Sequence, residues 1–267
     1  MLKFYKYSGA GNTFVVIDGR TIDASRFKRK DVVHALCMEH GTDGLMVLEN
    51  SDKADFRMSF FNPDGSGGMM CGNGGRCIVA FADVVGVKPF HTKEYAFEAA
   101  DGIHHAEILS HLGECKQVRL EMRDVDAVEE VAGGFFLNTG APHFVLFVED
   151  VEKVDVETGG RRLRSDGMFG PEGTNVDFVS VDADSVLHVR TFERGVEGET
   201  SACGTGITAS AIAACTKGIA STRVGDVHTY EVQARQDRLS VDFRQDGRAF
   251  VDVHLTGPTL NLGDLIE

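Results

Sequence analysis

Short stretches in which hydrophobic and polar residues alternate recur along this chain and predict β-strands. Two longer segments of small, apolar residues follow glycine loops and have the length of helices. The predicted strands are 2–7, 14–17, 44–49, 55–61, 94–99, 103–110 and 117–122, then 135–138, 143–148, 176–181, 186–192, 229–234, 238–243 and 249–255. The predicted helices are 25–40, 72–85, 158–164 and 204–217.

The two glycine loops are copies of one motif. Cys71-Gly72-Asn73-Gly74 returns as Cys203-Gly204-Thr205-Gly206, 132 positions later in a chain of 267 residues. An interval close to half the length is typical of two similar halves in tandem. We therefore predict an α+β fold of two pseudo-symmetric halves, each of antiparallel strands around one central helix. The predicted halves are 1–115, joined by a C-terminal strand 257–267, and 116–256.

The composition of the chain limits which partners and which cellular compartment can be expected. The formal charge of −14, without a dense Lys/Arg stripe, argues against nucleic acid. The apolar runs are far shorter than the roughly 20 residues of a membrane helix, and the start of the chain lacks a signal-peptide core. These features predict a soluble cytoplasmic protein with reduced thiols among its 6 cysteines. No Cys-x-x-Cys pair is present, so we predict no metal site.

The repeated motif suggests a chemistry. The first N–H groups of a helix have no intrahelical acceptor, and the helix dipole is positive there, so each glycine loop suits a carboxylate. The same field is expected to lower the pKa of a neighbouring thiol toward neutrality. Two facing thiols, one taking and one giving a proton at opposite faces of a carbon, would racemise or epimerise it. Cys71 and Cys203 are therefore the candidate acid/base pair.

Two other interpretations of these residues are possible. Most cysteines beside small residues are buried and inert, which is the interpretation adopted for the four others, at positions 37, 77, 115 and 215. Residues 204–209 also fit a Gly-x-Gly-x-x-Ala dinucleotide fingerprint. That fingerprint requires a strand directly before its first glycine, whereas a loop of about ten residues follows the predicted strand 186–192 here.

With both cysteine loops in view, the chain resembles the diaminopimelate epimerase family over essentially its whole length. The motifs that carry the resemblance are Gly9-Ala10-Gly11-Asn12, Asn62-Pro63-Asp64-Gly65-Ser66, Met70-Cys71-Gly72-Asn73-Gly74-Gly75-Arg76-Cys77, Pro142-His143, Asn175-Val176, Glu193-Arg194-Gly195 and Gly198-Glu199-Thr200-Ser201-Ala202-Cys203-Gly204-Thr205-Gly206. The resemblance implies an isomerase that interconverts LL- and meso-diaminopimelate without a cofactor, on the lysine and peptidoglycan pathway. It also implies two pseudo-symmetric halves with the active site in the cleft.

The same resemblance implies the roles of individual residues. Cys71 and Cys203 would be the catalytic acid/bases, and His143 and Glu193 would support the thiols. The backbone amides of Gly72, Asn73, Gly204 and Thr205 would hold the reacting carboxylate. The residues implied to bind the rest of the amino-acid substrate are Asn12, Asn62, Asn175, Glu193 and Arg194, and the guanidinium of Arg194 suits a distal carboxylate.

The chain departs from the family pattern at Thr13, at Gly67-Gly68, in one extra residue after Gly195 and at Ala141, where the family commonly has Asn. An alanine lacks a side-chain hydrogen-bonding group, so selectivity against shorter amino acids is expected to relax. A broader racemase, for instance one that accepts glutamate, stays open, as do a non-catalytic amino-acid-binding protein and a redox protein with a working Cys71–Cys203 disulfide. A homodimer also stays open.

Overall fold

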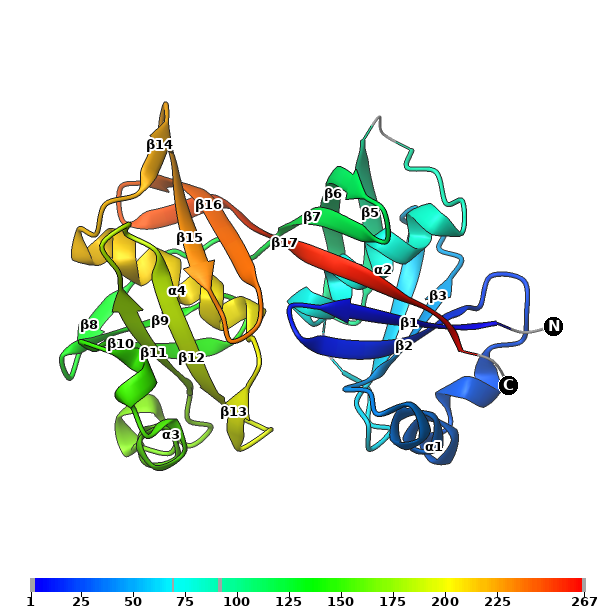
Figure 1. Cartoon of the computed structure of the whole chain (residues 1–267), viewed down its shortest axis with the longest axis horizontal. Helices are drawn as coiled ribbons and strands as arrows, with labels where there is room; N and C mark the ends of the chain where they lie inside the picture. The colour runs from blue at the N-terminus through cyan, green and yellow to red at the C-terminus, as the bar shows by residue number, and fades with distance from the viewer. Residues whose placement is uncertain (1–2, 69, 91–92, 266–267) are drawn as a thin grey trace. The chain divides into compact units, whose positions relative to one another are not determined.

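The structure is a computed structural model that describes residues 3–68, 70–90 and 93–265. The chain forms two compact units, Met1–Leu120 with Gly257–Glu267 and Glu121–Thr256 (Figure 1). The predicted boundary at 115/116 falls at the start of a strand, Cys115–Glu121, that pairs with strands of the first unit. Because of that pairing, every residue of this strand except Glu121 belongs to the first unit.

In the first unit, strands surround one helix, α2. Its elements are β1 (Phe4–Gly9), β2 (Asn12–Asp18), the 3-10 helix η1 (Ser25–Lys28), α1 (Lys30–His40), β3 (Leu45–Glu49), β4 (Phe56–Phe61), α2 (Gly72–Val84), β5 (Glu94–Ala99), β6 (Gly102–Leu112), β7 (Cys115–Glu121) and the second part of β17 (Ala249–Leu265). Successive strands from β1 to β7 pair in chain order, and β17 pairs with both β7 and β1. The first unit is therefore a closed ring of strands.

The second unit is built in the same way around α4. Its elements are β8 (Glu129–Val131), β9 (Gly134–Asn138), β10 (Pro142–Phe147), η2 (Val151–Lys153), α3 (Val156–Arg164), η3 (Gly167–Phe169), β11 (Asn175–Val181), β12 (Leu187–Glu193), β13 (Gly198–Thr200), α4 (Gly204–Lys217), β14 (Thr222–Val224), β15 (Val227–Gln233), β16 (Arg238–Asp246) and the first part of β17. Figure 1 shows its strands around α4.

The directions of the strand pairs repeat between the units. In the first unit β1–β2 is antiparallel, β2–β3 parallel, β3–β4 antiparallel, β4–β5 parallel and β5–β6 antiparallel. The series β9–β10, β10–β11, β11–β12, β12–β15 and β15–β16 has the same directions in the same order. α2 and α4 occupy the matching connections between parallel strands. This agreement confirms the predicted two-fold repeat within an α+β fold, although the prediction of antiparallel strands omitted the parallel pairs.

The two central helices are enclosed on nearly all sides. Every residue from Gly72 to Ala82 of α2 is buried, and so is every residue from Gly204 to Ala214 of α4 except Thr205. Most of these buried residues are apolar or small, because a helix buried all round cannot carry the polar stripe of a surface helix. The exceptions are Asn73 and Arg76 of α2, which form a hydrogen bond with each other. Strands and helix thus form one core in each unit.

Three local predictions differ from the structure. The helix expected at 25–40 is η1 followed by α1, because Arg29 is extended (ψ 135°) and interrupts the helix between them. The strand expected to end at 255 continues as β17 to Leu265, passing from the second unit into the first. The three-residue strands β8, β13 and β14 were not predicted, since three residues are too few to show alternation.

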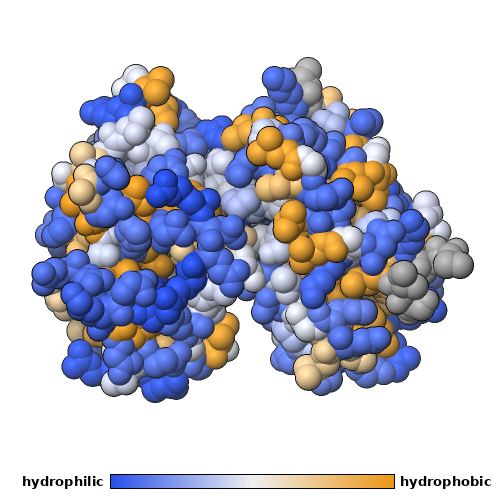
Figure 2. All heavy atoms as spheres, viewed as in Figure 1, coloured by the Kyte–Doolittle hydropathy of each residue, from blue (hydrophilic) through white to orange (hydrophobic). Residues whose placement is uncertain are grey.

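Two of the exposed apolar side chains in the first unit lie on either side of one strand. Leu112 of β6 and Leu260 of β17 both pair with Cys115 of β7, and they are 68% and 40% exposed. Figure 2 shows hydrophobic residues among hydrophilic ones on this unit's visible face. The homodimer stays a prediction. Within the described residues, no helix is long and apolar enough to cross a membrane.

Replacing Gly160 of α3 by alanine is expected to lower the free energy of unfolding by about 1–3 kcal/mol, because the added methyl overpacks the core. A Cβ at Gly160 would collide with the side chain of Phe192, the residue before Glu193 on β12. Urea denaturation of G160A measures the loss.

The neighbouring Gly159→Ala is the matched control. Its Cβ would lie 3.3 Å from the edge of the Phe178 ring, and an alanine in a helix gains about 0.5–1 kcal/mol over glycine. G159A should therefore equal or exceed the wild type in stability. Equal stability of G160A and G159A would contradict the close packing of α3 against β12.

Candidate active site

In the first unit, the predicted site residues gather at the start of α2. Cys71 is extended and precedes the helix, and its carbonyl accepts the first helical hydrogen bond from the Gly75 N–H, at 2.7 Å. The Asn73 side chain donates to Asn12 Oδ1 of β2 at 2.7 Å, and its Oδ1 accepts from the buried Arg76 at 2.8 Å. Polar groups from β2 and α2 thus fix the turn that carries Cys71.

Asn62 lies in the loop after β4 and behaves as a turn former. Its Nδ2 donates to Ser66 Oγ at 3.0 Å, and its backbone N–H donates to the Ser66 carbonyl at 2.9 Å. These bonds order the loop that leads toward Cys71. A role of Asn62 in substrate binding stays a prediction.

In the second unit, Cys203 precedes α4 with the same extended backbone. It is only 8% exposed, and its Sγ lies 3.3 Å from Thr205 Oγ1. The Thr205 carbonyl accepts from the Thr139 hydroxyl at 2.9 Å, which ties the helix start to the segment between β9 and β10. The second glycine loop is therefore held by a neighbouring strand connection, as the first is held by β2.

His143 and Asp177 form a fully buried pair beside this helix start. His143 Nδ1 lies 2.7 Å from Asp177 Oδ2, and His143 Nε2 lies 2.9 Å from Thr205 Oγ1. Thr191 donates to the other Asp177 oxygen at 2.7 Å. Parallel pairing of β10 with β11 and antiparallel pairing of β11 with β12 bring these side chains together.

Gly206 is required by this packing. A Cβ at that position would collide with the Asp177 carboxylate and lie 3.1 Å from His143 Cε1. The second glycine of the motif therefore lets the buried pair approach the first turn of α4. The corresponding Gly74 of α2 has Met46 Sδ at 3.2 Å from its would-be Cβ, so the first motif meets an apolar neighbour there.

Asn175 and Arg194 are joined to the same cluster. The Asn175 amide donates to the Pro142 carbonyl at 3.0 Å and lies 3.3 Å from His143 Nε2, while its Oδ1 accepts the Arg194 backbone N–H at 2.8 Å. Arg194 Nη1 reaches the carbonyls of Glu172 and Gly173 at 3.5 Å, which holds its side chain near the loop before β11.

Cys203 and Glu193 of this unit both have raised pKa values. Burial raises the pKa of Cys203 well above its ordinary value, and the carboxylates of Glu193 and Asp177 raise it further. The Thr205 hydroxyl and the Gly206 N–H oppose this rise without cancelling it. The expectation that the helix start lowers the thiol pKa is therefore wrong for Cys203, because desolvation outweighs the helix. Burial also raises the pKa of Glu193.

Three of the four cysteines outside the motifs also have raised pKa values. Burial raises the pKa of Cys77 to about 12, and it also raises the pKa values of Cys37 and Cys215. Cys203 shares this effect of burial, so the inert role of the four other cysteines stays a prediction. Among the described residues, no group of three or more His, Cys, Asp or Glu side chains could hold a metal ion.

The predicted residues thus form two sets, one in each unit. Asn12, Cys71, Gly72 and Asn73 meet in the first unit, with Asn62 on the adjoining loop. The set in the second unit is His143, Asn175, Glu193, Arg194, Cys203, Gly204 and Thr205. Asp177 was missed, although an acidic residue within the apolar run 176–179 is a sign of a buried partner.

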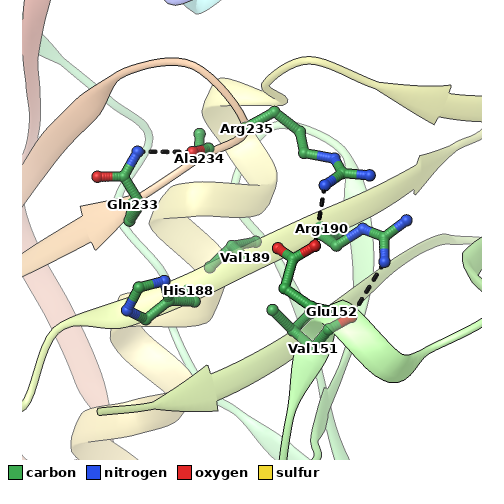
Figure 3. Close-up of a pocket in the computed structure, with 8 residues that line it drawn as sticks. All are labelled: Val151, Glu152, His188, Val189, Arg190, Gln233, Ala234 and Arg235. Atoms are coloured by element: carbon green, nitrogen blue, oxygen red, sulfur yellow. Dashed lines mark hydrogen bonds and ion pairs between the residues drawn. The ribbon is translucent and has the colours of Figure 1, made fainter. Parts of the chain in front are cut away.

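Among the cavities that the described residues line, a small one and a larger one lie outside these sets. One, of about 110 Å³, is lined by Val151, Glu152, His188 to Arg190 and Gln233 to Arg235 (Figure 3). Its arginines are already neutralised, Arg190 by Glu199 and Arg235 by Glu152 and Glu199. Typical ligand pockets hold about 300–1,000 Å³. A larger cavity of about 560 Å³ runs along β4 and the Gly67–Gly68 loop, next to Asn62.

Comparison with known proteins agrees with this architecture. Among solved structures, a phenazine biosynthesis protein of the PhzF family from Bacillus anthracis matches with a TM-score of 0.77, 14% identity, 99% of this chain and 98% of its own. A probable proline racemase from Agrobacterium radiobacter K84 matches with a TM-score of 0.69, 17% identity, and 100% and 93% coverage. These likenesses define the fold.

Sequence relatives define the family. The family model described as diaminopimelate epimerase matches residues 4–126 and 135–260. Proteins named diaminopimelate epimerase from Flavobacterium psychrophilum and Aquifex aeolicus are 39% and 40% identical, over 96% of this chain and 96% and 94% of their own lengths. The chain is therefore an isomerase of the epimerase class. It belongs to the diaminopimelate epimerase family, which confirms the resemblance in the sequence.

Replacing Glu193 by glutamine should change how stability depends on pH. Because the folded pKa of Glu193 lies above its ordinary value of 4.5, the folded state binds more protons, and its stability falls as pH rises from that value through the folded pKa. E193Q removes this loss, so its stability relative to wild type should rise with pH across that window. Urea unfolding from pH 4 upward measures the difference.

Glu199→Gln provides a control of opposite sign. Arg190 is the largest cause that lowers the pKa of Glu199, so this carboxylate stabilises the fold above its ordinary pKa, and the contribution is lost as pH falls. E199Q should lose stability relative to wild type as pH rises. The same pH trend in both variants would contradict the raised pKa of Glu193.

Proposed function

We propose that the protein epimerises LL-diaminopimelate to meso-diaminopimelate, with Cys71 and Cys203 as the acid/base pair. The product would serve lysine synthesis and the supply of peptidoglycan precursor. One observation carries the proposal: the same Cys-Gly-x-Gly helix start occurs at the matching connection of both units. The relatives named for this reaction support the substrate.

The proposed reaction uses the two half-sites on one substrate. The α-carboxylate is held by backbone N–H groups at Gly72, Asn73, Gly204 and Thr205, where two helix starts favour negative charge. One cysteine thiolate takes the α-proton, and the other cysteine thiol gives a proton to the opposite face of the carbon. The thiol and thiolate have then exchanged roles, and the reverse reaction restores them.

The distal end of the substrate needs separate recognition. Arg194 is the proposed partner of the distal carboxylate, because guanidinium can bind a carboxylate with two parallel hydrogen bonds. Asn12, Asn62, Asn175 and Glu193 are the proposed partners of the remaining polar groups. Because burial raises the pKa of Cys203, this cysteine is the proposed proton donor when a substrate first binds.

The test is turnover of LL-diaminopimelate by the reduced protein in deuterated water without added cofactor. Epimerisation should be accompanied by deuterium at the α-carbon, because the donated proton comes from a solvent-exchanged thiol. Cys71→Ser and Cys203→Ser should each lose about 10²–10⁴-fold in kcat, the usual contribution of general acid–base catalysis. NMR of the product reads both the epimer ratio and the deuteration.

Cys215→Ser is the matched control, since Cys215 lies in the last turn of α4, the same helix that Cys203 precedes. C215S should retain wild-type turnover. Binding of diaminopimelate without α-deuteration would instead indicate a non-catalytic binding protein. Full activity in either C71S or C203S would exclude the two-thiol mechanism.

Ala141→Asn should narrow the range of amino acids accepted, if the alanine relaxes selectivity. Ala141 is half-buried and lies next to Pro142-His143 at the start of β10. An asparagine there adds a polar group that a shorter substrate leaves unpaired. The measurement is kcat/KM for diaminopimelate relative to glutamate in both proteins, and unchanged ratios would rule out this explanation.

A further inference from the structure

A continuous chain of hydrogen bonds leads from the Cys203 thiol into the core of the second unit. Cys203 Sγ lies 3.3 Å from Thr205 Oγ1, which lies 2.9 Å from His143 Nε2. His143 Nδ1 lies 2.7 Å from Asp177 Oδ2, and Thr191 donates to Asp177 Oδ1 at 2.7 Å. His143 and Asp177 are both 0% exposed, so no bulk water competes for these bonds.

The directions of these bonds follow from their chemistry. The Asp177 carboxylate only accepts, so His143 Nδ1 carries the proton and donates it. In the neutral imidazole, Nε2 is then an acceptor. Asn175 supports this assignment independently: its Oδ1 accepts the Arg194 N–H and its Nδ2 donates to the Pro142 carbonyl, so the group that lies 3.3 Å from Nε2 is an N–H donor.

Thr205 then has one arrangement that satisfies both neighbours. Its hydroxyl donates to His143 Nε2 and accepts from the Cys203 thiol. Such a bridge matters because Cys203 is enclosed by groups that resist its ionisation: it is 8% exposed and shares its surroundings with the carboxylates of Glu193 and Asp177. When Cys203 must act as the base, its own proton needs an acceptor within the protein.

We propose that Thr205 and His143 relay the Cys203 proton and that Asp177 is the positioning residue of the relay. The Cys203 Sγ–H proton passes to Thr205 Oγ1 while the Thr205 hydroxyl proton passes to His143 Nε2. The products are a thiolate, an unchanged threonine hydroxyl and an imidazolium whose charge Asp177 balances. No electrons are transferred. The use of this thiolate as the base for a substrate α-proton rests on the proposed function, but its formation does not.

The first test compares Thr205→Val with Thr205→Ser. Valine keeps the shape of threonine without the hydroxyl, and serine keeps the hydroxyl without the methyl. Alkylation of Cys203 by iodoacetamide at neutral pH, followed site by site with mass spectrometry, reports the thiolate population without substrate. T205V should be alkylated about tenfold more slowly or worse, equal to a thiol pKa rise of about one unit, and T205S should stay close to wild type. Wild-type alkylation of T205V would overturn the relay.

The second test uses the sign of the effect of Asp177→Asn. If Asp177 acted on Cys203 only through its negative charge, removing that charge would make ionisation of the thiol easier and alkylation faster. The relay requires the opposite, slower alkylation, because the imidazolium loses its balancing charge. Faster alkylation of D177N, with near-ultraviolet circular dichroism unchanged, would overturn the role of Asp177.

The two proposals fail in distinguishable ways. Slow alkylation of Cys203 in T205V and D177N, together with absent α-deuteration in the wild type, would leave the relay standing and remove the epimerase. Normal epimerisation by the wild type together with normal alkylation of Cys203 in T205V would support the epimerase and overturn the relay. If D177N does not fold, the T205V and T205S pair still tests the relay, since Thr205 is only half-buried and both substitutions are small.

Discussion

The arrangement depends on one constraint: the first turn of an α-helix is enclosed by strands, where its backbone N–H groups must meet partners other than bulk water. Enclosure favours small or apolar residues along α2 and α4, with the hydrogen-bonded Asn73 and Arg76 of α2 as exceptions. It requires glycine at position 206, because the Asp177 carboxylate lies against the helix there. The side chain of the residue before each helix then lies beside the positive end of the helix dipole and the backbone N–H groups that have no acceptor within the helix. In both units that residue is a cysteine.

Much of this was accessible from sequence because the repeated motif is local. Cys71 and Cys203, the helices after them and most strands follow from spacing and alternation. Asp177 was missed because its partner His143 is 34 residues away and only the parallel pairing of β10 with β11 brings them together. The full length of β17 likewise depends on tertiary pairing with β16, β7 and β1, which overrides local propensity. The hydrophobic spacing of residues 25–40 did not reveal the break at Arg29. Helix-dipole reasoning alone also misjudged Cys203, since its burial cannot be seen in a motif.

The two units share a backbone plan but differ in what surrounds the cysteine. The turn that carries Cys71 is fixed by the amides of Asn12 and Asn73 together with Arg76, whereas the turn that carries Cys203 meets Thr205, His143 and Asp177. Both units keep the same helix start, but the polar side chains around it differ. The two cysteines therefore have different surroundings. The two thiols of the proposed pair thus differ in the groups that influence their ionisation.

The shared strand β17 has a consequence for how the chain folds as it is made. Its residues 257–265 close the ring of the first unit by pairing with β1 and β7, although β1 lies some 250 positions earlier in the chain. During synthesis, the edges of β1 and β7 therefore stay unpaired with β17 until residues 257–265 have been made. The first unit is therefore completed only after the second unit has been synthesised. In sequence, the second unit is a long insertion between two strands, β7 and the second part of β17, of the first unit.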